Sequence, residues 1–246
     1  MVDEKEMVVK SGEEYPVPSE NLTVQKLPTV ILVDTSISMA GELPGINAGI
    51  NTMVRDVQAD NVANQQVEFC IISFNDVAKL EQNWKPVNQM NPVEFTPSGC
   101  TNLEAGLTMA LNKSRERSDY YEHLGTRVKM PFLITITDGH ANSGDFNAIC
   151  NEIRSREEEK KIRPFTIAVS GYDKETIAKL SDKKRVLEFT GPDNHNYMEF
   201  FNFLTESLKV LSLPSVNGNV SVESNLGNPS KGSCMQIPDF NDWLNS

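Results

Sequence analysis

Two aspartates stand directly after short runs of apolar and β-branched residues. Asp34 follows residues 29–33 and Asp138 follows residues 131–137. Such runs are typical of strands that are buried on both faces of a sheet. Because parallel strands carry their carboxyl ends to the same edge, we expect both carboxylates to project from one edge.

Three hydroxyl side chains are expected beside these carboxylates. Ser36 and Ser38 alternate after Asp34, so a turn that leaves the strand can direct all three side chains inward, and Thr101 is predicted to open a helix whose N-terminus faces the same edge. Two carboxylates and three hydroxyls form an all-oxygen donor set, which suits a hard cation in octahedral geometry and contains no soft ligand for zinc or copper. The sequence therefore predicts a Mg²⁺ site, with Mn²⁺ as an acceptable substitute.

At least one coordination position of this site is expected to be exchangeable. Only two donors are charged, and Mg²⁺ in proteins usually keeps some of its water. An incoming carboxylate can occupy that position.

Each of these residues also has an ordinary role. Asp34 and Asp138 follow strands as turn-forming residues do, and Thr101 opens residues 101–104, which fit the S/T-x-x-E pattern of a helix cap. The occurrence of three motifs in order, each at the end of a suitable element, favours the metal site over these separate roles.

The apolar pattern along the chain alternates between strands and helices. Strands are predicted at residues 29–34, 67–74, 131–137, 164–169 and 186–189, with an edge strand at 78–84. Helices are predicted at residues 44–57, 101–111, 146–153, 177–180 and 196–211. This order predicts an α/β fold with a doubly wound, mainly parallel six-stranded sheet, one antiparallel edge strand and helices on both faces.

The three motifs resemble those of von Willebrand factor A (VWA) domains. Residues 34–38, Asp-Thr-Ser-Ile-Ser, are similar to the D-x-S-x-S signature of the family's metal-ion-dependent adhesion site (MIDAS). Residues 98–101, Ser-Gly-Cys-Thr, resemble the loop that supplies a threonine, and residues 137–139, Thr-Asp-Gly, resemble the loop that supplies a second aspartate. The resemblance covers residues 25–211 and implies the Rossmann-like fold of this family.

The resemblance also implies a role for each donor. Ser36, Ser38 and Thr101 stand where the family usually contacts the metal directly. Asp34 and Asp138 stand where it often acts through bound water, and an acidic side chain of the ligand completes the coordination.

Ile37 departs from the family pattern, which usually has glycine at this position of the first loop. Isoleucine resists positive φ, so the loop must either adopt a backbone that a β-branched residue accepts or carry strain.

Four neighbours of the donors are candidates for the ligand-binding face: Gly99, Cys100, Gly139 and His140. His140 lies two positions after Asp138, and we hypothesise that its protonation makes partner binding depend on pH. The alternative is an exposed imidazole without a role.

The resemblance implies a non-enzymatic module for protein–protein interaction. Residues 27–33 and 38–41 further resemble a bacterial intracellular group associated with tellurite resistance, which implies a scaffold in a stress-response or signalling assembly, with a kinase or phosphatase as partner. The alternative is a Mg²⁺-dependent phosphatase or hydrolase. Against it, Asp34 is followed by Thr-Ser rather than by a second aspartate, and the chain lacks a phosphate-binding glycine loop.

Composition narrows the expected partners and location. The chain of 246 residues has a formal net charge of -11 and no basic stripe, which argues against nucleic acid. The sequence has no apolar run long enough to cross a bilayer and no secretory signal in its first ten residues. Its four cysteines are widely separated, as expected for reduced thiols, so a cytoplasmic location is predicted.

Three regions are predicted: a lead segment at residues 1–24, the VWA domain at 25–211, and a flexible tail at 212–246 rich in Asn, Ser, Gly and Pro. Within the tail, residues 235–244 are expected either to dock on a partner or to fold back over the domain. Self-association is a further hypothesis, in which Asp239 or Asp242 reaches the metal of a neighbouring copy.

Overall fold

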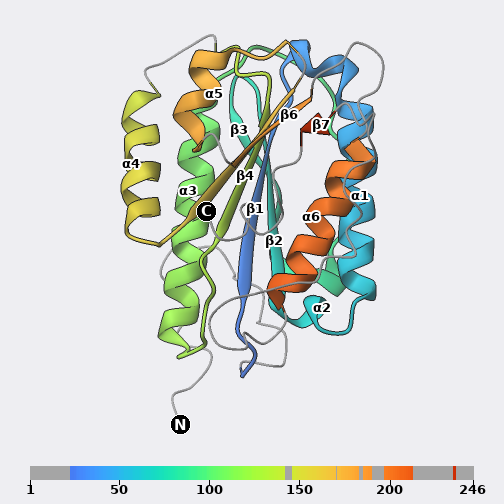
Figure 1. The fold of residues 1–246 in the computed structure, drawn as a ribbon, viewed down its shortest axis with the longest axis vertical. Helices are drawn as coiled ribbons and strands as arrows, with labels where there is room; N and C mark the ends of the chain where they lie inside the picture. Colours follow the sequence, from blue (N-terminus) through green and yellow to red (C-terminus); the bar gives the residue numbers. More distant parts are fainter. Residues whose placement is uncertain are drawn as a thin grey trace.

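The computed structural model describes residues 23–141, 146–169, 171–182, 185–189, 197–212 and 235–236. The predicted lead segment and most of the predicted tail therefore lie outside the described residues. In the described part of the chain, one twisted sheet lies between two layers of helices (Figure 1). No helix in this part has the length and apolar character needed to span a membrane.

The sheet has the strand order β3-β2-β1-β4-β5-β6-β7. Its strands are β1 (Leu27–Asp34), β2 (Val67–Phe74), β3 (Ala78–Pro86), β4 (Phe132–Thr137), β5 (Arg163–Ala168), β6 (Val186–Phe189) and β7 (Met235–Gln236). Strands β2, β1, β4, β5 and β6 are parallel, whereas β3 pairs with β2 in the antiparallel direction. The predicted α/β fold with an antiparallel edge strand is confirmed.

A short seventh strand extends the sheet beyond the six that were predicted. The backbone of β7 pairs with β6 in the antiparallel direction, with Met235 opposite Phe189 and Gln236 opposite Glu188. These two residues are the described part of the predicted docking segment 235–244.

Helices cover both faces of the sheet. The α-helices are α1 (Leu43–Ala59), α2 (Ala63–Gln66), α3 (Leu103–His123), α4 (Asn147–Glu158), α5 (Lys174–Leu180) and α6 (Tyr197–Ser212), and two 3₁₀ helices are η1 (Ile37–Gly41) and η2 (Val87–Gln89). Helices α1 and α6 lie on one face and α3, α4 and α5 on the other (Figure 1). Alternate residues of β1 supply the two cores, since Ile31 and Val33 pack toward α1 and α6 while Val30 and Leu32 pack toward α3.

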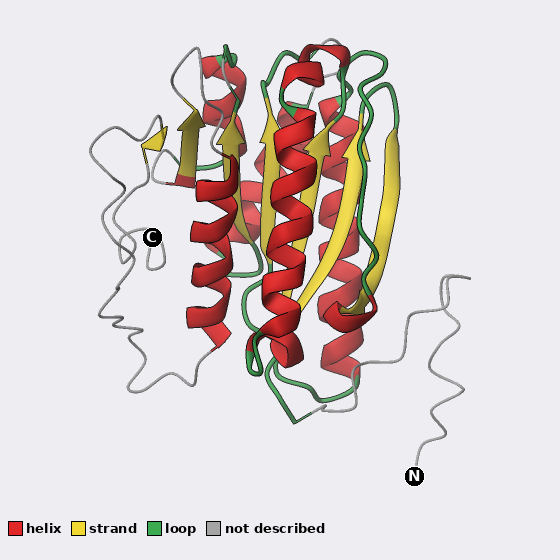
Figure 2. Ribbon diagram, turned by 90° about the vertical axis from the view of Figure 1, so that its right-hand side faces the viewer, coloured by secondary structure: helices red, strands yellow, loops and turns green. Residues whose placement is uncertain are grey.

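The arrowheads of the parallel strands point to the same end of the molecule, as seen from the α1 and α6 side (Figure 2). The loops that follow β1, β2 and β4 all leave the sheet at this end, which we call the carboxyl edge. The three predicted metal-binding motifs are on the loops that follow β1 and β4 and on the loop that precedes α3.

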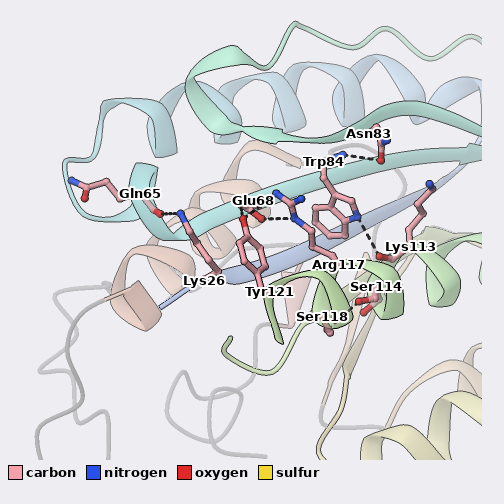
Figure 3. Close-up of polar contacts among 10 residues, drawn as sticks. All are labelled: Lys26, Gln65, Glu68, Asn83, Trp84, Lys113, Ser114, Arg117, Ser118 and Tyr121. Atoms are coloured by element: carbon pink, nitrogen blue, oxygen red, sulfur yellow. Dashed lines mark hydrogen bonds and ion pairs between the residues drawn. The ribbon is translucent and has the colours of Figure 1, made fainter. Parts of the chain in front are cut away.

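A buried polar cluster joins α3 to the opposite end of the sheet (Figure 3). The Arg117 guanidinium donates through Nε to Glu68 Oε2 at 2.8 Å and through Nη2 to the Tyr121 hydroxyl at 3.0 Å. The Tyr121 hydroxyl in turn donates to Glu68, and burial raises the pKa of Tyr121, which keeps this proton in place. The Arg117 guanidinium also lies 5.7 Å from the centre of the Trp84 ring.

This cluster explains why α3 is longer than the pattern 101–111 predicted. Beyond Leu111 the inward positions of the helix include Lys113, Arg117 and Tyr121, which are buried although their side chains are polar or charged. An apolar periodicity cannot identify such a helix face, so the predicted helix ended too early.

We predict that Arg117→Met lowers the free energy of unfolding by about 3–5 kcal/mol, because it leaves the Glu68 carboxylate buried without its cation. The matched control is Arg115→Met on the same helix, whose pair with Glu152 is exposed on both sides. That change should cost less than about 1 kcal/mol. Urea unfolding measures both, and equal losses for the two variants would contradict the role given to the cluster.

Candidate metal site

The two aspartates predicted to bind metal lie at the carboxyl edge, on neighbouring strands. Asp34 ends β1 and Asp138 follows β4, and these strands pair in parallel with Val33 opposite Ile136. Asp34 has no exposed surface, and its Oδ2 accepts a hydrogen bond of 2.7 Å from the Thr137 hydroxyl. Thr137, which the sequence reasoning did not single out, therefore orients the first carboxylate.

The carboxylates of Asp34 and Asp138 are both buried at this edge. Burial raises the pKa of Asp34, and the neighbouring charge of Asp138 acts in the same direction, whereas hydrogen bonds from Ser36 and Thr137 oppose both effects. A cation between the two carboxylates would stabilise their charged forms.

The first loop gathers its hydroxyls beside Asp34. The backbone N–H of Ser36 donates to Asp34 Oδ1 at 2.9 Å, which folds the chain back toward the carboxylate. The hydroxyls of Ser36 and Ser38 lie 3.1 Å apart. In an octahedral Mg²⁺ site, adjacent oxygen ligands are about 3 Å apart, because each lies about 2.1 Å from the ion.

Ile37 sits between these two serines without backbone strain. Among the described residues, Lys160 is the non-glycine residue with positive φ, so Ile37 adopts a backbone that a β-branched residue accepts. It begins the 3₁₀ helix η1, and its exposed fraction is 66%. The sequence left open whether the first loop is strained at Ile37 or adopts a backbone that isoleucine accepts, and the structure has the second arrangement.

The second loop holds Thr101 next to the helix cap rather than in it. Helix α3 begins at Leu103, and the side-chain oxygen of Asn102 accepts a hydrogen bond of 3.1 Å from the Ala105 N–H. The prediction that Thr101 caps this helix is wrong, because asparagine at the next position fills the role equally well. Thr101 is buried, and the cap does not use its hydroxyl.

Hydrogen bonds fasten the second loop to the first loop and to the β2–β3 turn. The Ser98 N–H donates to the Thr35 carbonyl at 2.8 Å, and the Ile37 N–H donates to the Gly99 carbonyl at 3.3 Å. Gly99 has a φ of 68°, and a Cβ there would lie 2.2 Å from Asp76 Oδ2. The other oxygen of Asp76 accepts from the Cys100 N–H at 3.0 Å.

The third loop turns sharply after Asp138. Gly139 has a φ of 74°, and the His140 N–H donates to Asp138 Oδ1 at 3.0 Å. The Asp138 carbonyl accepts from the Asp173 N–H at 2.8 Å, which ties this loop to the start of α5. Asp138 therefore has both its side chain and its backbone fixed.

The four candidates for the ligand-binding face differ in exposure. Cys100 and His140 are exposed and Gly99 is half-buried, whereas Gly139 is buried and donates to the Thr137 hydroxyl at 2.9 Å. Nε2 of His140 lies 2.9 Å from the Gly171 carbonyl oxygen. The proposed effect of His140 on partner binding remains a hypothesis.

The donor set fits a hard divalent cation. The described residues include no cluster of three or more His, Cys, Asp or Glu that could hold a metal. Coordination at the carboxyl edge would therefore depend on hydroxyls as well as on the two carboxylates. This is the combination of Asp34, Ser36, Ser38, Thr101 and Asp138 that the sequence predicts, and it suits Mg²⁺ or Mn²⁺.

An extended segment, residues 91–97, leads into the second loop and is held by two asparagines of α1. We call it the strap. The Asn47 amide donates to the Phe95 carbonyl at 3.0 Å and accepts from the Phe95 N–H at 2.8 Å. Asn51, one helical turn later, makes the same pair of bonds with Val93 at 2.8 and 2.9 Å. The two side chains thus pair with the strap as a neighbouring strand would.

The chain belongs to the von Willebrand factor type A domain family, whose model matches residues 29–202. Domains of this family are typically adhesion or protein-interaction modules and are usually not catalytic. A search of curated proteins finds no match to the chain.

The fold is similar to solved structures at low sequence identity. Proximal thread matrix protein 1 from the mussel byssus is 15% identical, with a TM-score of 0.51 over 77% of this chain and 49% of that one. The VWA protein from Catenulispora acidiphila is 14% identical, with a TM-score of 0.56 over 75% of this chain and 43% of that one. The domain of the pilus tip protein Mfa5 from Porphyromonas gingivalis is 12% identical, with a TM-score of 0.56 over 78% of this chain and 98% of that one.

One of these relatives has been solved with metal. A structure of the mussel protein has zinc in its MIDAS motif, at 15% identity and a TM-score of 0.50 over 75% of this chain and 48% of that one. The chain spans about half the length of the mussel protein and less than half of the Catenulispora protein. These likenesses establish the fold, and the assignment to the tellurite-resistance group remains a prediction.

We predict that replacing Asn47 and Asn51 together by leucine weakens Mg²⁺ binding by about tenfold, because the strap no longer positions the second loop. Isothermal titration calorimetry measures the affinity, and urea unfolding measures the loss of stability that accompanies the unpaired backbone groups.

The control is Gln58→Leu, which removes a 2.7 Å bond from α1 to the Val87 carbonyl outside the strap. It should lower stability without changing Mg²⁺ affinity. Equal effects of Gln58→Leu and the double replacement on Mg²⁺ affinity would contradict the positioning role.

Proposed function

We propose that this chain is a non-enzymatic interaction module that binds an acidic side chain of a partner protein through a divalent cation, preferentially Mg²⁺. The observation that carries the proposal is the convergence of three loops at the carboxyl edge. They bring together two fixed carboxylates and a pair of hydroxyls 3.1 Å apart, with Thr101 buried beside its helix cap.

The charges around the site support a metal-dependent mechanism. Besides Asp34 and Asp138, the loops and helix ends at this edge carry the exposed carboxylates of Asp76 and Glu104. Without a bound cation, the negative charge of this edge would repel an acidic partner. A bound cation supplies the positive charge and the open coordination position that a partner's carboxylate needs.

The chain's own residues set the geometry of that contact. Ser36 and Ser38 are available as neutral ligands, so the cation keeps more of its positive charge than it would among carboxylates alone. Asp34 is held by Thr137 and by the Ser36 N–H, and Asp138 by the His140 N–H, so both are oriented before a ligand arrives. The all-oxygen set supports Mg²⁺ or Mn²⁺, and the zinc seen in the mussel relative makes Zn²⁺ the informative competitor.

The cellular role of the chain is proposed from the resemblance of residues 27–33 and 38–41 to the tellurite-resistance group. We propose a cytoplasmic location and a scaffold role in a bacterial stress-response or signalling assembly, with a kinase or phosphatase of the same system as partner. Among the described residues, Cys100 and Cys150 are free thiols, as a reducing compartment would keep them. Self-association through the tail is the alternative source of the acidic ligand.

We predict that a partner from a lysate of the source organism is retained by the wild-type chain in Mg²⁺ and is lost in EDTA or with Asp138→Ala. Mass spectrometry of the retained proteins is the measurement. The matched control is Asp119→Ala, which removes an exposed carboxylate on α3 away from the carboxyl edge and should retain the same partner. If the partner is retained equally in Mg²⁺, in EDTA and by Asp138→Ala, it binds elsewhere on the chain.

We also predict no turnover of p-nitrophenyl phosphate above the buffer rate with Mg²⁺ or Mn²⁺. A VWA domain is usually a binding module, and no general base for phosphoryl transfer is evident in the sequence. If the chain does turn over this substrate and Asp138→Ala abolishes the activity, the alternative function as a Mg²⁺-dependent phosphatase or hydrolase would be supported instead.

A further inference from the structure

Two apolar side chains project into solvent at the carboxyl edge. Among the described residues, Ile37 and Val77 are the most exposed large hydrophobic side chains, at 66% and 65%. The next, Val62 at 39%, lies between α1 and α2 at the other end of the molecule. A single exposed apolar residue needs no explanation, but two such residues beside a candidate metal site do.

Both residues belong to segments that hold the second loop. The Ile37 N–H donates to the Gly99 carbonyl at 3.3 Å. Val77 closes the β2–β3 turn, where its carbonyl accepts from the Asn75 N–H at 3.1 Å, and the Asn75 side chain donates to the Ser98 hydroxyl at 2.8 Å. Residues 98–100 are therefore hydrogen-bonded both to the first loop, which contains Ile37, and to the β2–β3 turn, which contains Val77.

The internal packing of the chain does not use these two side chains. The two core clusters include neither Ile37 nor Val77. Their hydration is unfavourable in the free protein, and burial against another molecule would relieve it. Ile37 is also the position where the sequence departs from the glycine usual in the family, so this apolar group is a property of this chain.

We propose that Ile37 and Val77 form an apolar rim of the metal site, and that the partner presents its carboxylate from a segment in which the neighbouring side chains are apolar. This inference rests on the proposed function. The charge of the edge argues against an acidic cluster as ligand, since Asp76 lies beside Val77 and Glu104 lies in the first turn of α3. A single acidic residue flanked by apolar residues would coordinate the cation and cover the apolar rim. It would also bring little additional negative charge to the acidic edge.

A random peptide library displayed on phage tests this proposal with the full chain in Mg²⁺. Peptides released by EDTA should be enriched in Asp or Glu with apolar residues within two positions. The rim variant Ile37→Thr with Val77→Thr keeps the branching at Cβ in both residues but replaces one apolar branch of each by a hydroxyl. It should bind the selected peptides about tenfold more weakly, while its Mg²⁺ affinity equals that of the wild type.

Val62→Thr is the matched control, because it makes the same change at an exposed valine away from the carboxyl edge. It should bind the selected peptides as the wild type does. The proposed rim would be contradicted if the selected acidic peptides show no apolar preference, or if the rim variant binds them as the wild type does. Either result would be compatible with the proposed function. The absence of EDTA-released acidic peptides would overturn both.

Discussion

Parallel pairing of β1 with β4 places two carboxylates side by side where both strands end. Asp34 has no exposed surface, and a buried carboxylate is unfavourable unless hydrogen bonds or a cation stabilise its charge. Thr137 from the neighbouring strand and the Ser36 N–H from the following loop supply two of those hydrogen bonds. The first loop and the strand pairing therefore depend on each other through one side chain.

Helix α3 links this site to the opposite end of the sheet. Its first turn follows Thr101, and its last turns carry Arg117 and Tyr121 into the buried cluster with Glu68. The ion pair fixes one end of the helix against β2, and the Asn102 cap fixes where the helix begins. The position of Thr101 thus depends on packing along the length of the helix as well as on its own loop.

The sequence predicted the features that depend on local pattern. Continuous apolar runs identified the buried strands, and the aspartates that end two of them were enough to place the candidate site at one edge, as the pairing of β1 and β4 requires. The buried pair of Glu68 and Arg117 could not be predicted in this way, because the two residues are 49 positions apart and no local pattern indicates that they are partners.

Long-range contacts account for most of what the sequence did not predict. The bonds of Asn47 and Asn51 to the strap join residues more than forty positions apart, and Asp76 supports a loop that begins more than twenty residues later. Strand β7 is too short to have an apolar pattern of its own. The prediction that Thr101 caps α3 was wrong, because the capping pattern did not distinguish threonine from the asparagine that follows it.

We propose that five oxygen-bearing side chains from three loops hold one divalent cation at the carboxyl edge. Crystals grown with Mn²⁺ and measured at the manganese absorption edge would locate this ion by its anomalous signal. We expect one anomalous peak among Asp34, Ser36, Ser38, Thr101 and Asp138. A peak elsewhere, or none at this edge when Mn²⁺ is in large excess, would contradict it.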